Sequence, residues 1–307
     1  MLPKVPVLAY AEFYYRQHGA DVGFDPEVTW TLDDACRLRT RNTVHLLSME
    51  MCDVALAPTQ WQRSVFPREW QGKIKVIHDG VATERVKPNP AAVFALPSKN
   101  LRLGAGDEVV TYVARNLEPY RGFHVFMRAL PDLLRRRPKA HVVIVGGDGV
   151  SYGRAAPGGV TWKAMLLKEI GGVDESRVHF TGKIPYDRFV ELLQISRAHV
   201  YLTYPFVLSW SMIEAMSAGC IVVGSATGPV QEVITHGENG LLVDFFSGKQ
   251  LVDGVCRALD GGADIAAMRR RARETAVERY DVHRCLQAQW QLLSSLARGR
   301  AAPPPGT

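Results

Sequence analysis

The chain has 307 residues, of which 47% are hydrophobic and 22% charged, and its formal net charge is +6. This is the composition of a globular protein with enough apolar residues for two ordinary domains or one large one. No apolar run reaches the roughly 18 residues that a transmembrane helix needs, and the N-terminus lacks the apolar stretch and cleavage site of a secretion signal. We therefore expect a cytoplasmic protein, or one attached peripherally to the inner face of the membrane.

Two basic runs, RRRPK at 135–139 and RRRAR at 269–273, supply part of the positive charge. Both fall where we expect helix ends or exposed helix faces, so the simpler interpretation is a solvated helix face. The alternative is attraction to an anionic substrate or to an anionic membrane surface. Neither run has the interleaved aromatic residues of a nucleic-acid-binding groove, so we expect no nucleic-acid partner. The five cysteines include no C-x-x-C pair and are expected to be scattered, buried free thiols.

The first part of the chain, residues 1–85, predicts an incomplete α/β domain. It offers three candidate strands, at 5–10, 53–58 and 73–79, and one long helix at about 33–50. No glycine-rich turn follows the first candidate strand. This pattern is typical of the second half of a Rossmann-like domain whose first half is absent.

Residues 86–108 are expected to form an interdomain linker, because three prolines and two glycines interrupt them. Residues 109–280 alternate short apolar, β-branched runs with segments of helical periodicity. That alternation predicts a parallel sheet covered on both faces, which is a complete doubly wound Rossmann-like domain. Its ligand should lie beyond the C-terminal ends of the strands. A helix at 281–297 and a disordered tail at 298–307 are expected to complete the chain.

The most informative stretch is YLTYPFVLSWSMIEAMSAGC, residues 201–220. Ser211-Met-Ile-Glu214 matches the S/T-x-x-E capping box that opens a helix, and Gly219 stands where that helix should stop. Glu214 could therefore simply cap its own helix. The alternative follows from position, because a helix N-terminus at the C-terminal edge of a parallel strand favours a phosphate. A carboxylate one turn into that helix can accept hydrogen bonds from both hydroxyls of a ribose.

A second element follows the strand at 109–114, in the segment VARNLEPYRGFH. Arg115 and Arg121 lie on one strand-to-helix loop, and guanidinium groups match the oxygens of a diphosphate. In the simpler alternative, Arg115 pairs with Glu118 on the surface. The loop GGDGVSYG at 146–153 follows another strand, but it matches no phosphate-loop fingerprint closely.

Four segments, taken in order, resemble the donor-binding domain of family 4 glycosyltransferases with the GT-B fold. They are VARNLEPYRG, VHFTGKIP, SWSMIEAMSAGCIVVGSATGPVQEVI and GENGLLVD. The resemblance implies two Rossmann-like domains with a nucleotide-diphosphate sugar between them, and retention of anomeric configuration without a metal ion. It makes residues 1–85 the acceptor-side half-domain and residues 109–280 the donor domain, with the helix at 281–297 packing towards the N-terminal domain. The sequence contains no D-x-D motif, which agrees with a metal-free reaction.

The resemblance also implies roles for individual residues. Arg115 and Arg121 would hold the diphosphate and stabilise the leaving group, with Arg121 standing where the family usually has lysine. Glu214 would be the second, ribose-binding glutamate of the family's E-x7-E pair. Ile184 would lie against the nucleobase. The residues at the start of the helix that contains Glu214 would bind a phosphate of the donor through their backbone amides. They are Ser209, Trp210, Ser211 and Met212. No cofactor is implied beyond the UDP- or GDP-sugar donor, and the acceptor would be a polysaccharide, a lipid or a small molecule.

Two departures from the family pattern leave alternatives open. Phe206 stands where the first glutamate of the pair is expected, so it would change the contacts to the donor sugar. The family's first strand and glycine-rich loop should also precede Met1. Both departures suggest an alternative interpretation, in which the protein is a pseudo-glycosyltransferase that binds nucleotide sugar and acts with a partner subunit. A different GT-B enzyme, such as a nucleotide-sugar epimerase, is a third interpretation.

Overall fold

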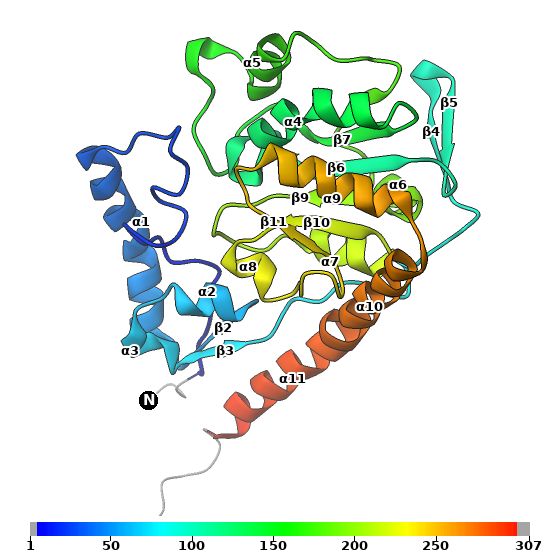
Figure 1. The fold of residues 1–307 in the computed structure, drawn as a ribbon. Helices are drawn as coiled ribbons and strands as arrows, with labels where there is room; N and C mark the ends of the chain where they lie inside the picture. The colour runs from blue at the N-terminus through cyan, green and yellow to red at the C-terminus, as the bar shows by residue number, and fades with distance from the viewer. Residues whose placement is uncertain (1–4, 300–307) are drawn as a thin grey trace, which may run out of the picture. The chain divides into compact units, whose positions relative to one another are not determined.

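The computed structural model describes residues 5–299 (Figure 1), and the chain divides into two compact units. Unit 1 consists of residues 1–80, 205–208 and 279–307, and unit 2 consists of residues 81–204 and 209–278. Each unit contains a parallel sheet flanked by helices, so the α/β fold class is confirmed.

Unit 1 is built on a three-stranded parallel sheet in the order β1-β2-β3. Thr31 and Asp34 form a capping box at the start of α1, with each side chain accepting from the other residue's backbone N–H. The candidate strands and the long helix of the sequence are therefore present, although the strands are shorter than expected. The elements are β1 (Leu8–Tyr10), α1 (Leu32–Met51), β2 (Val54–Ala57), α2 (Gln60–Ser64), α3 (Arg68–Gln71), β3 (Ile74–Val76) and α11 (Val282–Gly299).

The last helix, α11, packs within unit 1 against the turn that follows β3. Gly80 has a φ of +88°, and a Cβ added there would lie 2.5 Å from the Val282 Cα, so only glycine fits. Gln289 Nε2 donates to the His78 carbonyl at 3.3 Å. The segment expected as a C-terminal helix therefore belongs to the same unit as the N-terminal residues. Of the tail expected to be disordered, Arg298 still lies in α11, and residues 300–307 lie outside the described residues.

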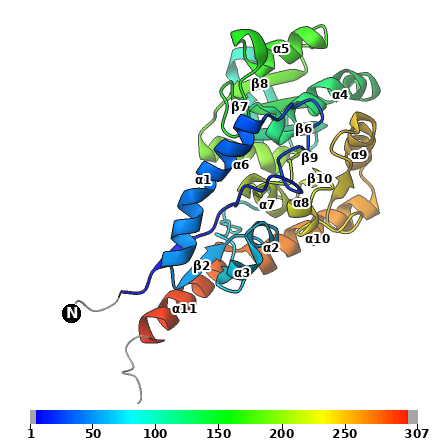
Figure 2. The same cartoon turned by 90° about the vertical axis from the view of Figure 1, so that its left-hand side faces the viewer.

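Unit 2 contains a six-stranded parallel sheet in the order β11-β10-β9-β6-β7-β8. In Figure 2 the sheet lies between α6 and α7 on one side and α4 and α9 on the other. Because both faces are covered, the strands are almost wholly buried, as predicted for a doubly wound domain. The strands of this sheet are β6 (Val109–Asn116), β7 (His141–Gly147), β8 (Val178–Gly182), β9 (Ala198–Tyr201), β10 (Ile221–Ser225) and β11 (Leu241–Val243). The α-helices are α4 (Phe123–Arg136), α5 (Trp162–Glu169), α6 (Tyr186–Ile195), α7 (Trp210–Ser217), α8 (Gly228–Gln231), α9 (Gly248–Asp260) and α10 (Ala263–Tyr280), which runs past the end of the unit.

Residues 86–108, which we expected to form a linker, contain an antiparallel hairpin of β4 (Val93–Leu96) and β5 (Leu101–Gly104). Phe94 and Leu103 are only 1% and 2% exposed and join an apolar cluster with Leu192 on α6. The hairpin therefore belongs to unit 2. The linker prediction missed it because the prolines and glycines were weighed more heavily than the alternating apolar residues between them.

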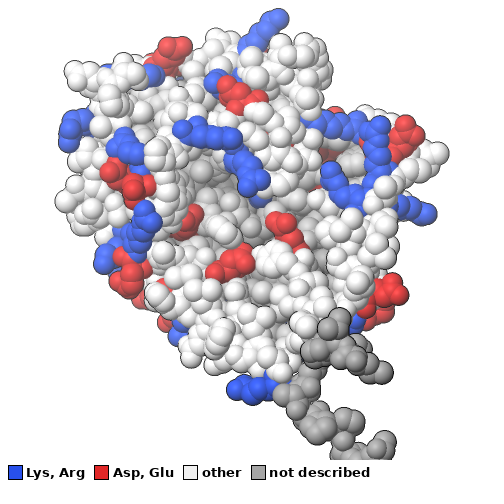
Figure 3. Space-filling model, turned by 180° about the vertical axis from the view of Figure 1, so that it is seen from behind, with Lys and Arg blue, Asp and Glu red and all other residues white. Residues whose placement is uncertain are grey.

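Charged residues of both signs share the surface shown in Figure 3, and this face carries no single continuous basic surface. Ion pairs such as Arg136–Asp253 and Lys163–Asp148 lie at or near the surface of unit 2. Four of the five cysteines are buried free thiols, as expected, whereas Cys36 is a free thiol that is exposed. Over residues 5–299, no helix combines the length and apolar character needed to cross a membrane.

Candidate active site

In the sheet of unit 2, the strand order runs outward in opposite directions from the parallel neighbours β6 and β9. The chain builds outward from β6 through β7 to β8, then returns to place β9 beside β6 and continues outward to β10 and β11. At such a point the loops that leave the two adjacent strands diverge, and the ligands of open α/β sheets bind in the resulting crevice. Arg115 lies at the C-terminal end of β6 and Arg121 follows that strand, whereas Ser209 and α7 follow β9. The residues singled out in the sequence therefore come from the two strands of this switch point.

Arg121 is the centre of the polar contacts at this switch point. Its Nη1 donates to the Tyr201 Oη at 3.0 Å and to the Thr203 Oγ1 at 2.8 Å, and the residue is 7% exposed. Burial disfavours the charged form, but the Tyr201 and Tyr152 phenols nearby outweigh it and raise the pKa of Arg121. The guanidinium is therefore a permanent cation held in place by hydroxyl groups.

A tight turn fixes the backbone of Arg121. The Tyr112 Oη donates to the Arg121 carbonyl at 2.7 Å, and Gly122 follows with a φ of +67°. A Cβ added at Gly122 would lie 2.3 Å from the Leu202 Cβ, which no side chain could accommodate. Glycine thus lets α4 begin directly after the arginine, close to the chain that leaves β9.

Arg115 differs from Arg121 because it is exposed at the end of β6. The expected alternative, a surface pair of Arg115 with Glu118, is wrong. Glu118 is buried with 0% exposure, and its carboxylate accepts from the backbone N–H groups of Ser151, Tyr152 and Gly153 at 2.9–3.3 Å. The carboxylate therefore organises the loop after β7 and leaves Arg115 available to a ligand.

The start of α7 is tied to the arginine through Tyr201. The Tyr201 Oη accepts from the Ser209 N–H at 2.7 Å as well as from Arg121, so one hydroxyl joins the two elements. Ser209 is the N-cap of α7, and its Oγ lies 2.9 Å from the Ser211 Oγ. Trp210 is 55% exposed, whereas Met212 is fully buried. Of the four residues expected at a phosphate, the three at 209–211 thus reach the surface, and Met212 can contribute only its backbone.

Glu214 does not form the capping box that its spacing suggested. The helix begins two residues earlier than expected, so Ser209 rather than Ser211 is the cap, and Glu214 lies in the second turn. Its Oε1 instead accepts from the Tyr186 Oη at 2.7 Å. Burial raises the pKa of Glu214, an effect that the Tyr186 hydroxyl partly offsets. The simpler interpretation, in which Glu214 caps its own helix, is therefore wrong.

Tyr186, Tyr201 and Thr203 were missed in the sequence. Tyr201 and Thr203 sit in and just after a strand that read as wholly apolar, and their hydroxyls at its C-terminal end were the available signal. Tyr186 opens α6 after Pro185, where a half-exposed tyrosine gives no sign of its partner 28 residues away. The Arg85 guanidinium lies 4.6 Å from the centre of the Tyr186 ring, which keeps the ring against Glu214.

We expect Tyr186→Phe to raise the affinity for a ribonucleotide about 3- to 5-fold. The ribose would no longer have to displace the phenol from Glu214, a hydrogen bond worth about 1 kcal/mol. Titration calorimetry with the donor's nucleoside diphosphate measures the change. The matched control is Tyr10→Phe, which also removes a phenol–carboxylate hydrogen bond, in this case to Asp79, and involves none of the predicted site residues. A clear loss of affinity in Tyr186→Phe would contradict the idea of competition and make Tyr186 a partner of the ribose.

Ile184 and Phe206 are the remaining predicted residues. Ile184 follows β8 and is partly buried against the apolar cluster that contains Phe94. Phe206 is 3% exposed and belongs to unit 1, where its ring lies 4.6 Å from that of Phe13 and 6.4 Å from that of Tyr15. The residue at the position of the first glutamate is therefore a packing residue of an aromatic cluster.

The geometry of unit 2 defines a doubly wound domain with a cationic, hydroxyl-rich site at its switch point. Residues 97–278 match the family described as glycosyl transferases group 1, and residues 1–86 match the one described as glycosyl transferase family 4 group. The chain belongs to the glycosyl transferases group 1 family, and it is an enzyme of the glycosyltransferase class.

Two relatives illustrate the range of the family. A GDP-mannose-dependent alpha-(1-6)-phosphatidylinositol monomannoside mannosyltransferase of Mycobacterium tuberculosis is 30% identical over 299 residues, which cover 92% of this chain and 69% of the relative. A D-inositol 3-phosphate glycosyltransferase of Corynebacterium aurimucosum is 24% identical over 233 residues, covering 75% of this chain and 54% of the relative.

Solved structures agree with the family at the level of the fold. Anabaena HepE in complex with UDP-glucose superposes with a TM-score of 0.67 at 19% identity, covering 94% of this chain and 72% of that one. Sucrose-phosphate synthase from Thermosynechococcus elongatus gives a TM-score of 0.69 at 22% identity, with 85% and 62% covered. The predicted GT-B fold is therefore confirmed.

Proposed function

We propose that the protein transfers a sugar from a nucleotide-diphosphate sugar to a polysaccharide, lipid or small-molecule acceptor, with retention of configuration and without a metal ion. The observation that carries the proposal is the contact of Arg121 with Tyr201 and Thr203, which joins the loop after β6 to the start of α7 at the switch point. A diphosphate is the ligand whose charge and size match a fixed guanidinium beside a helix N-terminus.

Each residue has a task in this reaction. When the bond between the sugar and the diphosphate breaks, negative charge grows on the leaving phosphate oxygens. Arg121, already cationic and already oriented, stabilises that charge without rearrangement, and Arg115 can close on the diphosphate from the exposed side. Glu214 accepts the two ribose hydroxyls, and Ile184 supports the base. These interactions hold the donor while the acceptor attacks.

We select the first substrates to test from those named for the relatives. GDP-mannose, named for the Mycobacterium tuberculosis relative, comes first, with a mannosylated phosphatidylinositol as acceptor, and UDP-glucose second. Each donor is tested for a rise in the thermal unfolding temperature and for transfer of labelled sugar, with and without EDTA. We expect one donor to stabilise the protein, transfer to be insensitive to EDTA, and the anomeric configuration of the donor to persist in the product by NMR.

Three other outcomes are informative. No stabilisation by any nucleotide sugar would contradict the proposal. Stabilisation without hydrolysis or transfer, alone or with acceptors, would instead support a nucleotide-sugar-binding pseudo-glycosyltransferase that acts with a partner subunit. Inversion of configuration would overturn the retaining mechanism while leaving the donor site intact.

Restoring the family's glutamate should destabilise this protein rather than improve it. Phe206→Glu would place a carboxyl group among the Phe13 and Tyr15 rings and remove a buried phenyl group, at a cost of about 3 kcal/mol or more in the free energy of unfolding. Phe206→Leu, which keeps an apolar side chain, is the matched control and should cost less. Urea unfolding measures both. A stable Phe206→Glu protein with increased transfer would refute the packing role of Phe206.

A further inference from the structure

A second cavity lies in unit 2, away from the switch point. It has a volume of about 620 Å³ and is lined by residues that precede three strands of the sheet, namely Ala105 before β6, Ser196 before β9 and Gly219 before β10. These are the N-terminal ends of the parallel strands, whereas the candidate active site lies beyond their C-terminal ends. The volume is within the usual 300–1,000 Å³ of small-molecule sites.

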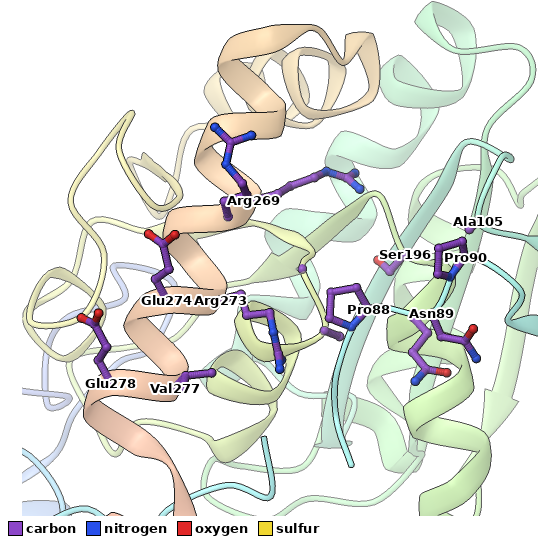
Figure 4. Close-up of a pocket in the computed structure, with 14 residues that line it drawn as sticks. Pro88, Asn89, Pro90, Ala105, Ser196, Arg269, Arg273, Glu274, Val277 and Glu278 are labelled. Atoms are coloured by element: carbon purple, nitrogen blue, oxygen red, sulfur yellow. The ribbon is translucent and has the colours of Figure 1, made fainter. Parts of the chain in front are cut away.

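One wall of the cavity is the basic run of α10 (Figure 4). Arg269 and Arg273 extend from α10 towards Pro88 and Ser196. Glu274 and Glu278 also line the cavity, and their side chains point away from Pro88 and Ser196 in Figure 4. The RRRAR run was expected to be a solvated helix face, and for these two arginines that expectation is wrong. Arg270 also lines the cavity and is exposed.

The charge of these arginines is only partly accounted for. Arg273 has a structural role, because its Nη1 donates to the Ser217 carbonyl at 2.7 Å and so stabilises the C-terminal end of α7. Arg269 donates from Nη2 to the Arg197 carbonyl at 3.0 Å, and burial lowers its pKa. Within residues 5–299, no carboxylate forms an ion pair with Arg269 or Arg270.

A partly buried guanidinium without a counter-ion is costly, and a bound anion would remove that cost. Arg269 inside the cavity and Arg270 at its rim can contact one anionic group from two sides. The cavity is also lined by amide side chains. Gln194 donates to the Lys87 carbonyl at 3.0 Å and keeps its amide oxygen as an acceptor, and the Asn89 Oδ1 accepts from the Ala91 N–H, which leaves its amide nitrogen as a donor.

We propose that this cavity binds a small phosphate monoester that carries hydroxyl groups, with the phosphate at Arg269 and Arg270 and the hydroxyls at Asn89 and Gln194. The site is separate from the proposed donor site, so the two ligands bind the same protein molecule together. It gives the second basic run of the sequence a role in binding that the transfer reaction itself does not require.

The test is titration calorimetry of the full chain with ribose 5-phosphate and, in parallel, inorganic phosphate, each in the presence of saturating nucleoside diphosphate. We expect the monoester to bind despite the nucleotide, and at least 5-fold more tightly than inorganic phosphate. Abolition of binding by the nucleotide would place the ligand in the donor site and overturn the proposal. Equal affinities for the two probes, or no binding at millimolar concentration, would do the same.

Variants of α10 locate the ligand. Arg270→Gln removes an exposed side chain, so it should leave the fold intact and weaken the monoester about 10-fold through loss of a charge-assisted contact. Arg269→Gln should weaken it at least as much, although loss of the bond to the Arg197 carbonyl can also lower stability. Arg271→Gln is the matched control, since Arg271 lies in the same run but donates to the Glu238 carbonyl instead of lining the cavity. An equal loss in Arg271→Gln and Arg270→Gln would contradict a specific site.

Discussion

Arg121→Met is expected to lower kcat about 10²- to 10³-fold, the effect of removing one preorganised charge that stabilises a leaving group. The change should appear in kcat more than in the donor KM, because the charge on the leaving diphosphate grows only as the bond breaks. Steady-state transfer assays with the donor identified by thermal shift measure both constants. Equal losses in kcat/KM and in donor affinity, with kcat unchanged, would reduce Arg121 to a ground-state binding residue.

Two controls separate this effect from misfolding. Arg121→Lys restores the residue common in the family and keeps the charge, so it should retain far more activity than Arg121→Met, although it loses the planar fork. Arg135→Met removes an exposed arginine from α4 and should change nothing. The Tyr201 and Thr203 hydroxyls lose their donor in Arg121→Met, so a fall of about 1–3 kcal/mol in the free energy of unfolding is expected as well.

Glu214→Ala is expected to weaken binding of the donor nucleotide at least about 30-fold. Two hydrogen bonds from ribose hydroxyls to a carboxylate are lost, each worth about 1.5–3 kcal/mol net of water, and about 1 kcal/mol is recovered because no Tyr186 phenol has to be displaced from Glu214. The identity of the lost contact can be tested with a 2′,3′-dideoxynucleotide. The wild-type protein should bind this dideoxynucleotide more weakly than it binds the ribonucleotide. The Glu214→Ala variant should bind the two nucleotides with equal affinity. Glu238→Ala, at an exposed glutamate of the same unit, is the control.

The pH dependence of binding follows from the same carboxylate. Burial raises the pKa of Glu214, so its ionised form is lost at a higher pH than that of an ordinary glutamate as the solution is acidified. Donor affinity in the wild-type protein should therefore begin to fall earlier on acidification than phosphate protonation alone would cause. The Glu214→Ala variant should lack that component. Identical pH profiles for the two proteins would exclude the carboxylate as a ribose ligand.

Much of unit 2 could be predicted from the sequence because a buried parallel sheet leaves a strong local signal. Each strand is a short apolar run between turn residues. As expected, a glycine follows the end of α7, because Gly219 with a φ of +83° comes directly after the C-cap residue Ala218. Arg115, Arg121 and Glu214 were singled out because each comes after an apolar run of this kind. The rule that ligands bind beyond C-terminal strand ends predicts that they belong to one site.

The sequence predictions that were wrong concern features that depend on contacts between residues far apart in the chain. Ser209 and Ser211 are equally good N-caps by sequence, and the Tyr201 hydroxyl, which accepts from the Ser209 N–H, selects the first. The partner of Glu214 is likewise set by the packing of α6 near α7, which no local pattern encodes. Hairpin β4–β5 was missed for a similar reason, since its apolar residues become informative only against Leu192.

The division of unit 1 into three chain segments has a consequence for building hybrid enzymes. A donor unit taken from a relative cannot be exchanged as one uninterrupted piece between residues 80 and 279, because residues 205–208 of that stretch belong to the other unit. The exchange would replace Phe206 by the relative's residue while its ring partners Phe13 and Tyr15 stayed in place. A working chimaera must therefore keep this tetrapeptide from the N-terminal parent and join the foreign sequence on either side of it.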